Sequence, residues 1–205
     1  MLDAVPTALE RVLAAGTDAQ RPTPYDALGA ARHMWLADQR IDMGALAASL
    51  GISRATLYNW VGDRDRLITE VLWSLTERTY QQAREAANGT GAAYISDVIE
   101  HYLNALADSE PTRRFIERDP EFALGVLTSK RTTYQRRLIA VLADLIAEQM
   151  RDTDYVPPLE PESLAYVLIR IGESFIFNDV ITGSEPDLSK AIQASRVLLH
   201  AAPLP

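Results

Sequence analysis

The spacing of the apolar residues is the feature that most constrains the fold of this chain. Leucine, isoleucine, valine and aromatic residues recur three and four positions apart along almost the whole sequence, which is the repeat of one face of an α-helix. Alternating β-branched runs joined by Asn-Gly or Asp-Gly turns, which mark hairpins, are nearly absent. The sequence therefore predicts an all-α protein.

Capping residues divide the first part of the chain into helices. An arm over residues 1–21 precedes them, and we expect it to be loose because two prolines close it. Each expected helix follows a residue whose side chain can accept a hydrogen bond from the first turn. The expected helices, with their N-caps, are Tyr25–Gln39 (Thr23), Met43–Leu50 (Asp42), one that ends near Trp60 (Ser53) and one that ends near Ala87 (Asp63).

The rest of the chain is predicted to hold further helices, separated by proline and glycine. We place a domain boundary inside the helix that follows Asp63, so that residues 22–70 form one module and residues 71–205 form a single helical bundle. The later helices are expected at Ala92–Asp108, Pro111–Asp119, Glu121–Ser129, Thr132–Arg151, Pro161–Ile181 and Leu188–Leu199.

Composition narrows the class of protein. The chain has no cysteine, which excludes disulfides and thiolate metal sites, and its N-terminus lacks the basic flank and apolar run of a signal peptide. We therefore expect a cytoplasmic protein. A net charge of −8 argues against indiscriminate coating of nucleic acid. Residues 21–70, however, carry six arginines and six acidic residues, so this segment is neutral and leaves room for a small DNA-contacting face.

The two short helices around Gly51 have the pattern of a helix-turn-helix. Ala47 is small enough to let the helices approach closely, and Gly51, four positions later, supplies a left-handed turn. In such a pair the second helix protrudes far enough to enter the major groove of DNA. Its outward residues would be Arg54, Thr56, Tyr58 and Asn59, which suit contacts to guanine, thymine, phosphate and adenine.

The segment LAASLGISRATLYNWVGDRDRLI, from Leu46 to Ile68, closely resembles the DNA-binding signature of TetR-family repressors. The resemblance implies a homodimer that binds operator DNA and a small-molecule effector, without metal or cofactor. It also implies a phosphate contact from Arg64. Trp60, Val61 and Gly62 depart from the residues common in the family, and acidic residues flank Arg64. The residues implied to lie on the recognition helix are Arg54, Ala55, Thr56, Tyr58, Asn59 and Trp60.

The last two predicted helices offer a dimer interface, as the resemblance also implies. From Leu164 to Ile181 the helix is apolar on nearly all sides, which favours burial against both its own domain and a partner. The final helix, Leu188–Leu199, would complete a two-fold interface. Burial within the same chain remains the alternative.

A mixed stripe on the same helix is a candidate ligand site. Tyr166, Arg170, Glu173 and Phe177 recur at helical spacing and would give an apolar pocket a few polar groups, although a solvent-exposed Arg–Glu pair explains the pattern equally well. Further wall residues could come from aromatic positions that would otherwise be ordinary core: Trp73, Tyr102, Phe122 and Tyr134.

The segment IGESFIFNDVITGSEPD, residues 171–187, resembles the quorum-signal-degradation repressor subgroup of the family, which implies a lactone or acyl-type effector. Two rival functions are an enzyme and a helical carrier. No enzyme motif is present; Asp97, Glu100 and His101 form half of a helical metal motif without its second half. A helical carrier or adaptor that has lost DNA binding stays open. The sequence thus predicts a ligand-responsive transcriptional regulator.

Overall fold

The computed structural model describes residues 21–178 and 182–201. All regular elements within these ranges are helices, which confirms the predicted all-α class. The N-terminal arm and the predicted helix end at Ile181 lie outside the described residues, apart from Arg21. The helices are α2 (Pro24–Leu36), α3 (Met43–Ser49), α4 (Arg54–Val61), α5 (Arg64–Ala86), α6 (Gly91–Ala107), α7 (Glu110–Arg118), α8 (Pro120–Leu127), α9 (Tyr134–Asp152), α10 (Pro161–Ile176) and α12 (Leu188–Leu199).

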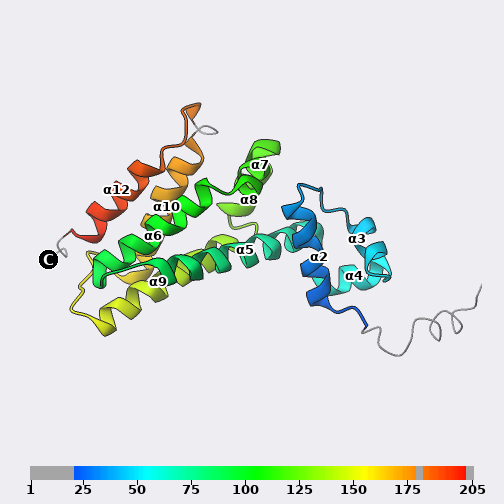
Figure 1. Cartoon of the computed structure of the whole chain (residues 1–205), viewed down its shortest axis with the longest axis horizontal. Coiled ribbons are helices and arrows are strands. Elements are labelled where there is room, and N and C mark those ends of the chain that lie inside the picture. Colours follow the sequence, from blue (N-terminus) through cyan, green and yellow to red (C-terminus); the bar gives the residue numbers. More distant parts are fainter. Residues whose placement is uncertain (1–20, 179–181, 202–205) are drawn as a thin grey trace, which may run out of the picture.

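The molecule is elongated, with two groups of helices joined by one long helix. Figure 1 shows α2, α3 and α4 gathered at one end and α6, α9, α10 and α12 at the other, while α5 extends from the first group into the second. The expected boundary between residues 70 and 71 falls inside α5, which is continuous there.

The four predicted N-caps of the first part are confirmed. Each side-chain oxygen accepts a hydrogen bond from a backbone N–H in the first turn of its helix, which satisfies a donor that has no partner inside the helix. Thr23 and Asp26 form a reciprocal capping box. The bonds are Asp26 N to Thr23 Oγ1 (3.4 Å), Ala45 N to Asp42 Oδ1 (2.7 Å), Thr56 N to Ser53 Oγ (3.0 Å) and Arg66 N to Asp63 Oδ1 (2.8 Å).

Two helices end earlier than the periodicity predicts. α2 stops at Leu36 rather than Gln39, because Asp38 adopts a left-handed conformation with φ of +58° and turns the chain away. α10 stops at Ile176, with Phe177 as its C-cap. Past α10 the apolar pattern continues because Phe177 also packs on the core, whereas the residues directly after α2 are exposed.

One apolar cluster runs through both groups of helices. Leu46, Leu57 and Leu67 are fully buried beneath the first three helices, and burial of each such side chain contributes about 1.5–3 kcal/mol. The same cluster continues without interruption to Val126 of α8 and Phe177 after α10. A second cluster, around Ile95 and Ile146, holds α5, α6, α9 and α10 together farther along the molecule. The two ends are therefore packed against one another as well as joined by α5.

Candidate nucleic-acid interface and ligand cavity

α3 and α4 form a tight helical corner. Gly51 has a φ of +66°, the left-handed conformation that glycine adopts without steric cost, and Ala47 is 2% exposed at the helix contact. Leu57 is fully buried on the inner face of α4. Gly62, where proline is common in the resembling family, has a φ of +74°, which a proline ring cannot reach. The local backbone thus explains this departure from the signature.

The face of α4 opposite Leu57 points to solvent. Arg54, Ala55 and Asn59 are exposed, and Tyr58 is 48% exposed. Thr56 and Trp60 lie at the edges of this face and are half-buried. A short helix with a buried inner face and an exposed polar outer face is the arrangement that a groove-reading helix requires.

Arg54 is held at the start of α4 by the neighbouring helix. Its guanidinium lies against Gly44 of α3, so closely that a Cβ at that position would come within 2.1 Å of Nη2. The positive charge contributes to lowering the pKa of Asp42, after the larger effect of the hydrogen bond from the Ala45 backbone. Arg54 is therefore positioned before any contact with nucleic acid.

Arg64 lies at the junction of the two helical groups. Its Nε donates a hydrogen bond to the Ile41 carbonyl at 3.0 Å, and its guanidinium stands 5.7 Å from the centre of the Phe122 ring. Arg66, two residues later, has a side chain that is 78% exposed and lies 3.9 Å from the Asp63 carboxyl. The phosphate contact implied for Arg64 remains a prediction, but this side chain already contacts both groups of helices.

A cavity of about 210 Å³ lies among α5, α6, α7, α9 and α10. Its walls are mostly aliphatic, as in small-molecule sites, and α2 contributes Leu36 to them. Polar groups are few. The lining residues that carry a hydroxyl or a carboxyl group are Thr76, Thr79, Tyr80, Tyr102, Ser109, Thr112, Tyr134 and Glu173.

Hydroxyl groups and one carboxyl give the cavity its polar character. Thr76 Oγ1 and the Tyr134 hydroxyl are 2.6 Å apart and buried, and burial raises the pKa of both Tyr134 and Tyr102, which keeps these phenols neutral. Burial also raises the pKa of Glu173 to about 7, against the opposing effect of Arg170, whose Nη1 donates a hydrogen bond to the carboxyl at 2.6 Å.

The structure brings together four of the eight residues proposed for a ligand site. Tyr102, Tyr134, Glu173 and Phe177 line the cavity. The other four lie elsewhere: Trp73 packs edge-on against Tyr134 from outside with ring centres 6.2 Å apart, Phe122 packs on Phe115, and Tyr166 and Arg170 point outward from α10.

Sequence reasoning missed several wall residues. Thr76 could have been found, because it is a polar residue on the same face of α5 as the buried Leu72. Leu36 carried no such signal, since it lies in the module expected to bind DNA and nothing local shows that it faces another group of helices.

The partial metal motif of α6 has other partners. His101 Nε2 lies 3.8 Å from Asp97 Oδ2, Asp97 accepts a hydrogen bond from the Asn88 backbone, and Glu100 pairs with Arg196 of α12. Within the described ranges no group of three or more potential ligand side chains could hold a metal ion. Over the same ranges, no helix has the length and apolar character needed to cross a membrane.

Comparison with known proteins decides the family. Residues 90–200 match the family model described as the tetracyclin repressor-like C-terminal domain, which covers more than half of the chain. The chain belongs to the TetR family. It is accordingly a ligand-responsive transcriptional regulator, and members of this family are DNA-binding proteins rather than enzymes.

Two solved TetR-family structures resemble the whole fold. The transcriptional repressor QsdR from R. erythropolis is 29% identical, with a TM-score of 0.80 over 90% of this chain and 99% of that one. The repressor AlkX from Dietzia sp. strain DQ12-45-1b, implicated in biodegradation of n-alkanes, is 23% identical, with a TM-score of 0.61 over 88% of this chain and 96% of that one. Among curated proteins, no sequence matches.

Proposed function

We propose that this TetR-family protein is a repressor that binds a pseudo-palindromic operator as a homodimer through α4, and leaves it when an effector occupies the cavity. The observation that carries the proposal is the exposed outer face of α4, on which Arg54, Tyr58 and Asn59 reach solvent while Leu57 is buried on the inner face. Residues 22–70 serve DNA binding in this proposal, and residues 71–205 serve effector binding and dimerisation.

The outer faces of α10 and α12 support a homodimer. The two helices pack side by side (Figure 1), and each exposes a large apolar side chain: Tyr166 is 52% exposed and Val197 is 74% exposed. An exposed apolar side chain on each of two adjacent helices supports an interaction surface there. A two-fold pairing there would present two copies of α4 to the two half-sites of an operator.

Aromatic contacts support coupling between the cavity and α4. The ring of Trp35 in α2 lies 4.6 Å from that of Phe115 in α7, and Phe115 packs edge-on against Phe122 in α8 at 6.0 Å. The cavity itself includes Leu36 of α2 and Ile116 of α7. An effector would therefore contact a DNA-binding helix and its neighbour at the same time.

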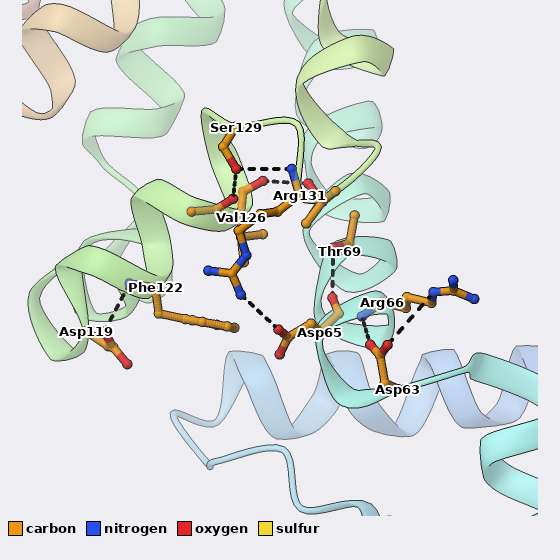
Figure 2. Close-up of polar contacts among 11 residues, drawn as sticks. Asp63, Asp65, Arg66, Thr69, Asp119, Phe122, Val126, Ser129 and Arg131 are labelled. Carbon is orange, nitrogen blue, oxygen red and sulfur yellow. Dashed lines mark hydrogen bonds and ion pairs between the residues drawn. The ribbon is translucent and has the colours of Figure 1, made fainter.

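Ion pairs reinforce the same contact. Asp38, just after α2, pairs with Arg118 of α7 and lies 3.5 Å from Arg114 Nη1. Figure 2 shows Arg131, in the turn before α9, directed at Asp65 in the first turn of α5, with 3.3 Å between Nη2 and Oδ2. A displacement of α7 or of this turn would thus be transmitted to α2 and to the start of α5, and with them to α4.

The effector we propose is a small acyl-type compound or a lactone. The aliphatic lining of the cavity favours a ligand with an apolar chain. The likeness to QsdR, at 29% identity, supports the lactone or acyl-type effector that the resemblance of residues 171–187 implies.

Selection of bound sequences from random duplex DNA tests the operator proposal. We expect the wild-type protein to enrich a two-fold related motif, and Tyr58→Ala or Asn59→Ala to cost about 1–3 kcal/mol of affinity for it, because each removes a base or phosphate contact. Gln81→Ala, on the exposed surface of α5, is the matched control and should bind normally. Failure to enrich any motif, or full affinity in both α4 variants, would instead indicate a carrier that has lost DNA binding.

A further inference from the structure

Glu173 is the one carboxyl group among the residues that line the described cavity. The surrounding wall is otherwise built from aliphatic and aromatic side chains with a few hydroxyls. A carboxylate in such a place is costly unless something compensates its charge. Its presence therefore calls for a chemical partner, either in the protein or in the ligand.

The protein compensates the charge with one cation, Arg170, and with the neutral amide of Gln135 in α9, which also lowers the pKa of Glu173. Arg170 donates to Glu173 Oε2 from the outer surface of α10, where its own side chain is 46% exposed, whereas the Glu173 side chain is 11% exposed. Water screens the Arg170 charge more than it screens Glu173. The raised pKa of Glu173 shows the consequence, since burial outweighs the attraction of Arg170.

The other polar groups near this wall are neutral. The hydroxyls of Thr76 and Tyr134 satisfy each other at 2.6 Å, and burial keeps the Tyr102 phenol protonated. Neither lysine nor arginine is among the cavity-lining residues. A ligand with a negative charge would therefore meet a carboxylate and no cation of its own, in surroundings where like charges repel strongly.

We propose that the cavity, taken as the effector site of the proposed function, selects small apolar molecules whose one polar end donates hydrogen bonds to Glu173, and rejects carboxylates of the same chain length. Alcohols, amide N–H groups and ammonium groups have the required chemistry, because an ionised carboxyl only accepts hydrogen bonds. Among the acyl-type compounds and lactones proposed as effectors, those that carry an amide N–H fit this site, and a lactone without a donor does not. The volume of about 210 Å³ is below the roughly 300–1,000 Å³ of sites for drug-sized ligands, which limits the molecule to a short chain.

A series of eight-carbon probes tests the selectivity without DNA. Binding of 1-octanol, octylammonium and octanoate to the purified full chain is measured at pH 8 by calorimetry and by the change in melting temperature, at which pH the Glu173 carboxyl is mostly ionised. We expect the alcohol and the ammonium to bind at least about tenfold more tightly than octanoate, the difference that corresponds to about 1.4 kcal/mol.

Two variants assign the effect to one carboxyl. Glu173→Gln should bring the affinity for octanoate to within about threefold of that for octanol and should weaken octylammonium at least about tenfold. Glu162→Gln, at an exposed position in the first turn of the same helix and outside the cavity lining, should change neither. If Glu173→Gln does not fold, the wild-type series still decides the matter.

The outcomes separate this proposal from the operator proposal. Equal binding of octanoate and octanol by the wild-type protein, or absence of binding by all three probes, would overturn the selectivity proposed for the cavity. Neither result bears on DNA binding, which the selection experiment measures through α4. Conversely, a chain that failed to bind any operator but kept the preference for donors over carboxylates would overturn only the operator proposal.

Discussion

Gly51 and Gly29 have different backbone conformations, left-handed at Gly51 and helical at Gly29. Alanine at each position therefore tests the cost of the conformation alone. Neither position has a heavy atom within 4 Å of the place where a Cβ would stand, so alanine fits at both. Gly51 has a φ of +66°, whereas Gly29 lies inside α2. We expect Gly51→Ala to lower the free energy of unfolding by about 1–2 kcal/mol, because an L-residue is strained in the left-handed region.

Gly29→Ala should have the opposite sign and raise the free energy of unfolding by about 0.5–1 kcal/mol, since glycine in a helix interior costs that much relative to alanine. Urea denaturation of both variants measures the two effects. No loss at Gly51 would contradict the left-handed conformation of the turn between α3 and α4, and a loss of stability at Gly29 would contradict its placement inside α2.

Single residues were predictable where the cause of their role is local. Thr23, Asp42, Ser53 and Asp63 were all recognised as N-caps, because a cap depends only on the next three residues. The stripe on α10 was ambiguous for a different reason. Its four residues share one face, yet neighbouring helices cover the turn that holds Glu173 and Phe177 and leave the turn with Tyr166 open, which periodicity alone does not reveal.

At the scale of elements, the contact between α2 and α7 gives a prediction about coupling. Asp38 carries both ion pairs to α7, and its φ of +58° lies where asparagine is as acceptable as aspartate. Asp38→Asn therefore removes the charge without straining the backbone. We expect faster hydrogen exchange at the amides of Ala37, Asp38 and Gln39, which close the end of α2.

The global stability of Asp38→Asn should change by less than about 1 kcal/mol, because all three side chains are partly exposed and surface pairs contribute little. Asp154→Asn, an exposed position in the loop after α9, is the matched control and should leave exchange at α2 unchanged. Unchanged protection at α2 in Asp38→Asn would show that the ion pairs do not fix this contact.

The elements themselves followed from periodicity, but their ends and packing partners did not. Every predicted helix of the described chain is present, because helix formation depends on local apolar spacing and caps. The end of α2 was placed three residues late, since the left-handed turn at Asp38 involves neither glycine nor proline. The neighbours of α7, which include Trp35, depend on tertiary packing that no local pattern encodes.

At the scale of the whole molecule, the continuous apolar cluster connects the proposed site of ligand binding to the proposed site of DNA binding. It reaches from Leu46 beneath α3 to Phe177, which also lines the cavity. A packed interior does not deform gradually, so occupation of the cavity would favour one of a few discrete arrangements. The effector would then shift the equilibrium between arrangements only as far as its affinities for them differ.

The proposed dimer gives the last prediction. Tyr166→Glu combined with Val197→Glu places two charges on the exposed apolar face of α10 and α12, and charges that would be buried on pairing weaken association strongly. Light scattering after size-exclusion chromatography measures the mass in solution. We expect twice the chain mass of 22.7 kDa for the wild-type protein and the mass of one chain for the double variant. Val156→Glu, at a loop residue that is 64% exposed, should leave the dimer intact. A double variant that remained dimeric with an unchanged affinity for palindromic DNA would require the two copies of α4 to be paired through a different face.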